Sequence, residues 1–153
     1  MITVRHWKKS SLALWQKKLS SNKRQNVKAY VCTMIVASFL ATYLDLLFVG
    51  KGLYEFPSRP FPSIFSINIL FTLVILPLFT LVIIFIFNRI SRLLKLLAAI
   101  IIGLSAAIME QIMEKLGMFQ PSVHWQHEYS LVGYFIFVLL IWKFYRWCLS
   151  PLE

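Results

Sequence analysis

The sequence contains four long apolar runs, and the second of them, residues 64–87, has no charged side chain over 24 consecutive positions. A transmembrane helix needs about 20 mostly apolar residues to cross the ~30 Å hydrocarbon core of a bilayer. The other three runs cover residues 29–49, 93–114 and 129–149. The sequence therefore predicts an all-α fold, a four-helix transmembrane bundle that forms a single domain over residues 29–149.

The composition excludes several other classes of protein. Of the 153 residues 59% are hydrophobic and 14% are charged, whereas a soluble domain has about 45–50% apolar and about 25% charged residues. A soluble enzyme, a disordered tail and a disulfide scaffold are all excluded. The two cysteines, Cys32 and Cys148, fall at the predicted cytoplasmic ends of the first and fourth spans. Because the cytoplasm is reducing, we expect two inert thiols and no disulfide.

The orientation follows from the distribution of charge. There are 16 Lys and Arg residues and 6 Asp and Glu residues. Thirteen of these basic residues lie in the N-terminal segment, in the turn 88–95 and near the C-terminus. These three segments share one side of a four-span bundle. The positive-inside rule therefore predicts a multi-pass protein of the cell membrane with both termini in the cytoplasm.

Residues 1–28 form a basic segment with eight Lys and Arg residues and no acidic residue. Each basic residue near the surface adds ~1 kcal/mol of attraction to anionic lipid. We therefore expect anionic lipid headgroups, and no nucleic acid, as the partner of this segment. From about Thr3 to Leu19 the Trp and Leu residues fall roughly on one side, which predicts an amphipathic helix in the headgroup plane. A disordered basic tail that only fixes the topology is the alternative.

Polar residues within the spans mark a candidate site. Asp45, Asn68, Glu110 and Tyr134 each lie four or five residues inside the outer end of a different span, roughly 6–8 Å below the interface. An acid inside a span costs ~2.5–3.5 kcal/mol and normally faces the bundle interior. We expect these four residues, with Glu114 one turn beyond Glu110, to form a polar pocket. The alternative is that they only link helices, at ~0.6 kcal/mol per hydrogen bond.

The first outer loop, residues 50–62, contains two Gly and three Pro residues and cannot form a regular helix. Arg59 lies between two of these prolines on a stiff, extended segment. We expect its guanidinium either to pair with Glu55 or Glu114 or to bind an anionic headgroup.

The second outer loop offers weak candidates for a metal site. His124, His127 and Glu128 supply nitrogen and oxygen atoms of the kind that bind zinc and other transition metals. The two histidines lack the spacing of a metallohydrolase helix. Histidines and aromatic residues at a membrane interface are the ordinary alternative, and this alternative needs no cofactor.

Three functions fit these patterns. The leading one is a non-enzymatic membrane protein whose outer polar pocket binds a partner protein, a second copy or a lipid headgroup. The predicted binding residues are Asp45, Arg59, Asn68, Glu110, Glu114 and Tyr134. An alternative is a membrane-embedded enzyme acting on a lipid or isoprenoid substrate, with Asp45 or Glu110 as general acid or base. A proton-coupled small transporter is a further alternative.

Four sequence features together support a family resemblance. They are Asp45 at the end of the first span, the aromatic and proline-rich loop Tyr54–Pro62, the pair Glu110 and Glu114, and Trp125 in the following loop. In these features the chain resembles a group of small four-helix integral membrane proteins of spore-forming Firmicutes. The resemblance covers roughly residues 40–147. It implies the four-helix fold and a Gram-positive cell membrane, and it implies no activity.

Overall fold

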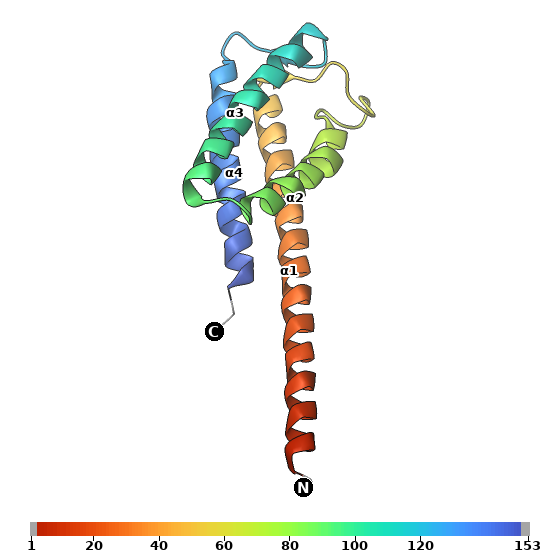
Figure 1. The fold of residues 1–153 in the computed structure, drawn as a ribbon. Coiled ribbons are helices and arrows are strands. Elements are labelled where there is room, and N and C mark those ends of the chain that lie inside the picture. Colours follow the sequence, from red (N-terminus) through yellow and green to blue (C-terminus); the bar gives the residue numbers. More distant parts are fainter. Residues whose placement is uncertain (1–2, 151–153) are drawn as a thin grey trace.

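The structure is a computed structural model that describes residues 3–150, with side chains from residue 24 onward. The four helices of the described residues pack into one helical body, which we call the bundle, and the first part of α1 extends well beyond it (Figure 1). Both ends of the described chain emerge on the same side of this bundle (Figure 1). The elements in chain order are α1 Thr3–Gly50, β1 Tyr54–Glu55, a π-helical turn Phe71–Ile75, α2 Leu76–Phe87, α3 Arg92–Lys115, β2 Gln120–Pro121 and α4 His127–Leu149.

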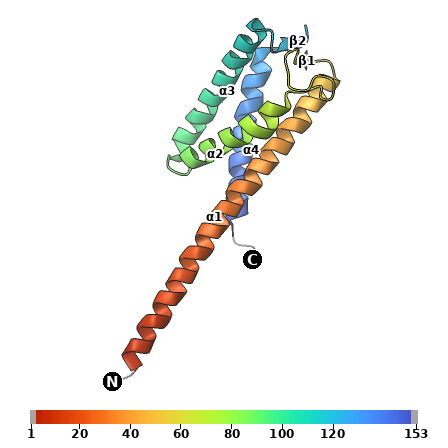
Figure 2. The same cartoon turned by 90° about the vertical axis from the view of Figure 1, so that its right-hand side faces the viewer.

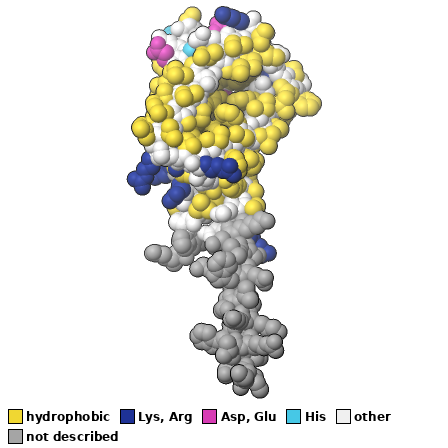
Figure 3. Space-filling model, viewed as in Figure 1, with side chains coloured by type: hydrophobic (Ala, Val, Ile, Leu, Met, Phe, Trp, Pro, Cys, Tyr) yellow, Lys and Arg dark blue, Asp and Glu magenta, His cyan; other side chains and the backbone are white. Residues whose placement is uncertain are grey.

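Three helical segments are long and apolar enough to cross a membrane: Arg24–Gly50, Arg92–Lys115 and His127–Leu149. Few of their residues are buried inside the bundle, and large apolar side chains such as Phe39, Ile101 and Leu140 are exposed. Figure 3 shows this apolar surface over the bundle, with Lys and Arg side chains gathered where it ends. An apolar surface of this extent is unfavourable in water and matches the hydrocarbon core of a bilayer. The predicted helical fold is confirmed, and three of its helices have the length and apolar character of membrane spans.

The second predicted span, residues 64–87, differs from the structure. The apolar helical stretch here is Phe71–Phe87, whose 17 residues measure about 25 Å along the axis, and it lies obliquely to α1 and α4 (Figures 1 and 2). It begins late because the Arg59 guanidinium donates to the carbonyl of Phe65, at 2.6 Å, and thereby extends the loop. The side chain of Asn68 then accepts a hydrogen bond from the Phe71 amide, at 3.2 Å, and so caps the helix.

Pro77 is predicted to kink the second span, and the structure has a π-helical turn that ends two residues before this proline, at Ile75. The Leu76 amide donates to the carbonyl of Phe71, five residues earlier. In this register the Thr72 carbonyl would accept from Pro77, which has no N–H. The hydroxyl of Ser38, on α1, donates to that carbonyl at 2.6 Å. A side chain from the neighbouring helix thus replaces the hydrogen bond that the proline removes.

The predicted amphipathic helix from Thr3 to Leu19 is not a separate element. The backbone of α1 runs without a break through this segment and through residue 28 into the first span (Figure 1). An interfacial helix would need a bend between the two segments, and α1 is continuous there. The side chains that would make this segment amphipathic lie outside the described residues, so its expected contact with lipid headgroups stays a prediction.

Helices α3 and α4 form the most extensive contact in the bundle. Ala99, Gly103 and Ala107 recur every fourth residue along α3, and all three are buried. A Cβ atom at Gly103 would lie 2.6 Å from the carbonyl oxygen of Leu131 on α4. The absence of a side chain therefore lets the two backbones approach, as in the small-residue contacts of other membrane helices.

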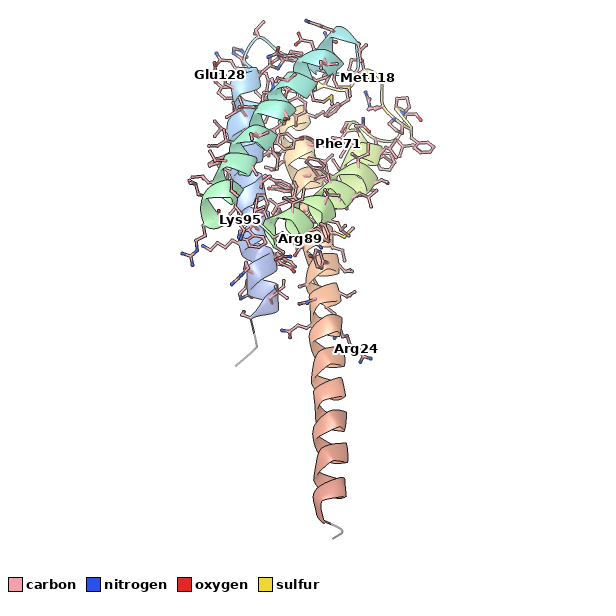
Figure 4. The ribbon with its side chains drawn as sticks, in the orientation of Figure 1. Arg24, Phe71, Arg89, Lys95, Met118 and Glu128 are labelled. Atoms are coloured by element: carbon pink, nitrogen blue, oxygen red, sulfur yellow. The ribbon has the colours of Figure 1, made fainter. Side chains whose placement is uncertain are left out.

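The two ends of the bundle differ in charge. Arg89 and Lys95 lie at one end, whereas Met118 and Glu128 lie at the other (Figure 4). We call the first end the basic end, because it holds Arg89, Arg92, Lys95, Lys143 and Arg146. We call the second end the acidic end, because it holds Asp45, Glu55, Glu110, Glu114 and Glu128. At the basic end the Asn88 side chain donates to the hydroxyls of Tyr30, at 2.9 Å, and Tyr145, at 3.1 Å, and so ties the turn after α2 to α1 and α4.

Candidate functional site

At the acidic end the two loops combine into one structure. Strand β1 pairs with β2 in antiparallel register, with Tyr54 opposite Pro121, and the Ser122 amide donates to the Leu53 carbonyl at 2.9 Å. Gly52 and Gly117, with φ angles of 66° and 69°, end α1 and α3 in the left-handed conformation that glycine favours. We call residues 51–68 and 116–126 together the loop platform.

Aromatic side chains pack the loop platform onto the bundle. Tyr54 is buried, and its ring lies 4.8 Å from the Trp125 ring and 5.1 Å from the Phe119 ring, centroid to centroid. Trp125 also contacts Phe48, on α1, at 5.7 Å. Edge-to-face and tilted pairs of this kind contribute about 0.5–1.5 kcal/mol each beyond the area they bury. The aromatic loop residues therefore hold the two loops to each other and to α1.

Asp45 is joined to the loop platform by a hydrogen bond. The Tyr54 hydroxyl donates to Asp45 Oδ1 at 2.7 Å, from the first outer loop to the last turns of α1. Burial, followed by the charge of Asp45, raises the pKa of the Tyr54 phenol well above its usual range. This phenol therefore remains a proton donor at any physiological pH. The acid that sequence reasoning singled out thus has a fixed partner from the first outer loop.

Glu110 accepts three hydrogen bonds. Trp125 Nε1 lies 2.6 Å and His127 Nδ1 lies 2.8 Å from Oε1, while the Ser130 hydroxyl donates to Oε2. The Glu110 side chain is only 12% exposed. These donors come from the second loop and from the first turn of α4, so one carboxylate holds α3, the loop and α4 together.

His127 bridges two carboxylates. Its Nδ1 faces Glu110, and its Nε2 lies 3.0 Å from Glu114 Oε2. Glu114 is one turn beyond Glu110 on α3, which puts the two acids on the same face. A neutral imidazole donates from one nitrogen only, so two such bonds require either an imidazolium ion or a protonated carboxyl group. Glu114 is 43% exposed and is the carboxylate of this group most open to a ligand.

The remaining predicted site residues lie in different surroundings. Tyr134 lies on α4, and among the described side chains it forms no hydrogen bond with Asp45 or Glu110. Asn68 is occupied as a helix cap. Arg59 donates to the carbonyls of Phe56, Pro62 and Phe65, and among the residues with described side chains it forms no ion pair with an acid. It therefore organises the first loop from within.

The weak metal candidates are not gathered around one point. His124 and Glu128 are exposed, whereas His127 has both ring nitrogens engaged by Glu110 and Glu114. Among the residues whose side chains are described, no three His, Cys, Asp or Glu side chains are placed to hold one ion. The structure thus gives the metal hypothesis no support from this part of the chain.

Sequence reasoning missed several partners of the two acids as site residues, namely Tyr54, Trp125 and Ser130. A signal was present, since tyrosine and tryptophan carry a polar group that needs an acceptor when it is buried. The candidate site as a whole is a polar and aromatic network at the acidic end, running from Asp45 through Tyr54 and Trp125 to Glu110 and His127.

The chain matches no family model, no curated protein and no solved structure. The fold and the geometry of the site are therefore the basis for assigning a function.

Proposed function

We propose that the chain is a non-enzymatic multi-pass protein of the cell membrane whose loop platform binds a partner membrane protein on the outer side. The observation that carries this proposal is that Asp45 and Glu110, the two acids best suited to chemistry, already accept hydrogen bonds from fixed internal donors. A general acid or base needs a free lone pair or proton directed at a substrate. Acids that internal donors hold in place favour a rigid binding surface over a catalytic centre.

The exposed face of the loop platform supplies the contact surface. Val123 is 94% exposed, and Met118 and His124, in the same loop, are also exposed. Glu114 and Glu128 add acidic groups at the rim. An exposed apolar patch rimmed by charge is typical of protein contact sites. The complementary partner therefore carries apolar and basic side chains, and a lipid headgroup is the competing ligand.

The proposed topology places both termini in the cytoplasm and the loop platform outside. The excess of Lys and Arg at the basic end supports this orientation. Helix α2 and the loop before it return the chain to the basic end, and we count this oblique return as the fourth crossing. A cysteine at Val123 should react with a membrane-impermeant maleimide in intact cells, and one at Ser91 only after permeabilisation. The reverse labelling pattern would contradict the orientation.

Site-specific photo-crosslinking in native membranes tests the binding proposal. A photoreactive amino acid at Val123 should give one discrete protein adduct, and the same group at the lipid-facing Leu104 should give lipid adducts only. Glu110→Gln and Asp45→Asn, which weaken the anchors of the loop platform, should each reduce the Val123 adduct. Lipid adducts alone at Val123, or a protein adduct unchanged in both variants, would refute the proposal.

A further inference from the structure

A groove between α3 and α4 at the basic end belongs to none of the contacts described above. Its volume is about 500 Å³, and it lies between the first turns of α3 and the last turns of α4. Three cationic side chains, one indole ring and two leucines line it: Arg92, Lys95, Arg146, Trp142, Leu96 and Leu139. The two ends of the bundle thus present different chemistry to the two membrane surfaces.

Two of the three cations of this groove contact the Trp142 ring and no acid. Lys95 Nζ lies 4.3 Å and Arg146 Cζ lies 6.0 Å from the centroid of the Trp142 ring. Within the part of the chain whose side chains are described, both ion pairs are formed by His127, at the acidic end. Every acidic residue in that part also lies at the acidic end. The groove therefore concentrates positive charge that none of the described acids neutralises. An anionic ligand could bind there.

The groove also has an apolar side that a free anion would not use. Leu96 and Leu139 line it together with the cations, and Leu93 and Leu97 beside it are exposed toward the surroundings of the bundle. Lys and Arg side chains gather where the apolar surface ends (Figure 3). The start of α3 adds the positive end of a helix dipole. A ligand that fits both parts carries a phosphate at one end and hydrocarbon at the other.

We propose that this groove is a binding site for one anionic phospholipid. Its phosphate lies among Arg92, Lys95 and Arg146, and an acyl chain runs along Leu96 and Leu139. Basic grooves between transmembrane helices bind lipid headgroups in this manner. The site is distinct from the basic segment 1–28, whose attraction to a charged surface needs no groove. On the positive-inside orientation it faces the cytoplasmic leaflet.

Lipid retention by the full-length protein tests this proposal. The purified protein is equilibrated with equal amounts of phosphatidylglycerol and phosphatidylcholine in mild detergent, and bound lipid is counted by native mass spectrometry. The wild type should prefer phosphatidylglycerol at one site. Lys95→Gln with Arg146→Gln should reduce that preference about 25-fold, since each cation near the surface contributes roughly a fivefold factor.

Two controls separate the groove from general electrostatics. Lys115→Gln removes a cation from the opposite end of α3 and should leave the preference unchanged, as should Lys8→Gln with Lys9→Gln in the N-terminal segment. The single variant Arg146→Gln should show a preference for phosphatidylglycerol about fivefold lower than that of the wild type. It replaces the double variant if the latter does not fold. An unchanged preference in the groove variants, an equal loss in either control, or displacement of the lipid by millimolar inorganic phosphate would overturn the proposal.

Discussion

Replacing Gly103 by alanine should destabilise the bundle, although the same change in most helices is favourable. Alanine is preferred over glycine in a helix interior by about 0.5–1 kcal/mol. Here the new Cβ would lie 2.6 Å from the Leu131 carbonyl oxygen and 3.4 Å from its carbonyl carbon. Both atoms are backbone atoms of α4 and cannot rotate away. The helices must therefore separate by about 0.8 Å at their crossing to restore ordinary contact distances.

The expected cost can be estimated from these two effects. Overpacking at a close contact costs typically 1–3 kcal/mol, and the gain in helix propensity offsets up to about 1 kcal/mol. Gly103→Ala should therefore lower the free energy of unfolding by about 1–2 kcal/mol. The measurement is reversible unfolding in mixed micelles of mild detergent and dodecyl sulfate, followed by far-ultraviolet circular dichroism.

Gly133 provides the matched control. It is a glycine inside α4, and a Cβ atom there would meet no other atom within 4 Å. Gly133→Ala should leave the free energy of unfolding unchanged or raise it by up to about 1 kcal/mol. A Gly103→Ala variant as stable as the wild type would refute the close approach of α3 and α4, and an equal loss in Gly133→Ala would refute the structural reasoning.

Two further substitutions test the hydrogen bonds that hold the oblique helix and the loop platform. Ser38→Ala leaves the Thr72 carbonyl without its donor and should lower the free energy of unfolding by about 1 kcal/mol in the same assay. Ser105→Ala is the control, because its exposed hydroxyl bonds only within α3, and it should leave the free energy of unfolding almost unchanged. Trp125→Phe keeps the aromatic packing but removes one of the three donors to Glu110. This variant should speed amide hydrogen exchange in residues 117–126 and leave exchange at the basic end unchanged. Uniform acceleration over the whole chain would contradict a local role for the Trp125–Glu110 hydrogen bond.

The limits of the membrane spans could be predicted from the sequence wherever hydropathy decides them. The predicted spans 93–114 and 129–149 end within two residues of α3 and α4. The second span could not be placed in this way. Its start depends on Arg59 binding carbonyls several residues further along the chain, a contact that leaves no mark in local hydropathy. The π-helical turn likewise depends on a serine from another helix.

The same distinction applies to the candidate site. Asp45 and Glu110 were predicted from their depth in the spans, and Glu114 from its place one turn beyond Glu110; all three lie at the acidic end in contact with the loop platform or with α4. Their donors could not be predicted, since Tyr54 and Trp125 reach the acids only through the pairing of two loops distant in sequence. The close contact of Gly103 with the α4 backbone was not predicted from the sequence either.

The donors around Glu110 explain why an acid occupies this position. Trp125, His127 and Ser130 converge on it from the loop and from α4. An ionised carboxylate has about four lone-pair sites and can accept from all three, whereas a hydroxyl or an amide oxygen has two. A carboxylate inside a span costs ~2.5–3.5 kcal/mol, and hydrogen bonds to a charged group return about 1.5–3 kcal/mol each. The groups that Glu110 joins thus explain its presence within a span. Glu114 also contacts His127 but is far more exposed. It is therefore the acid with lone pairs free for a ligand.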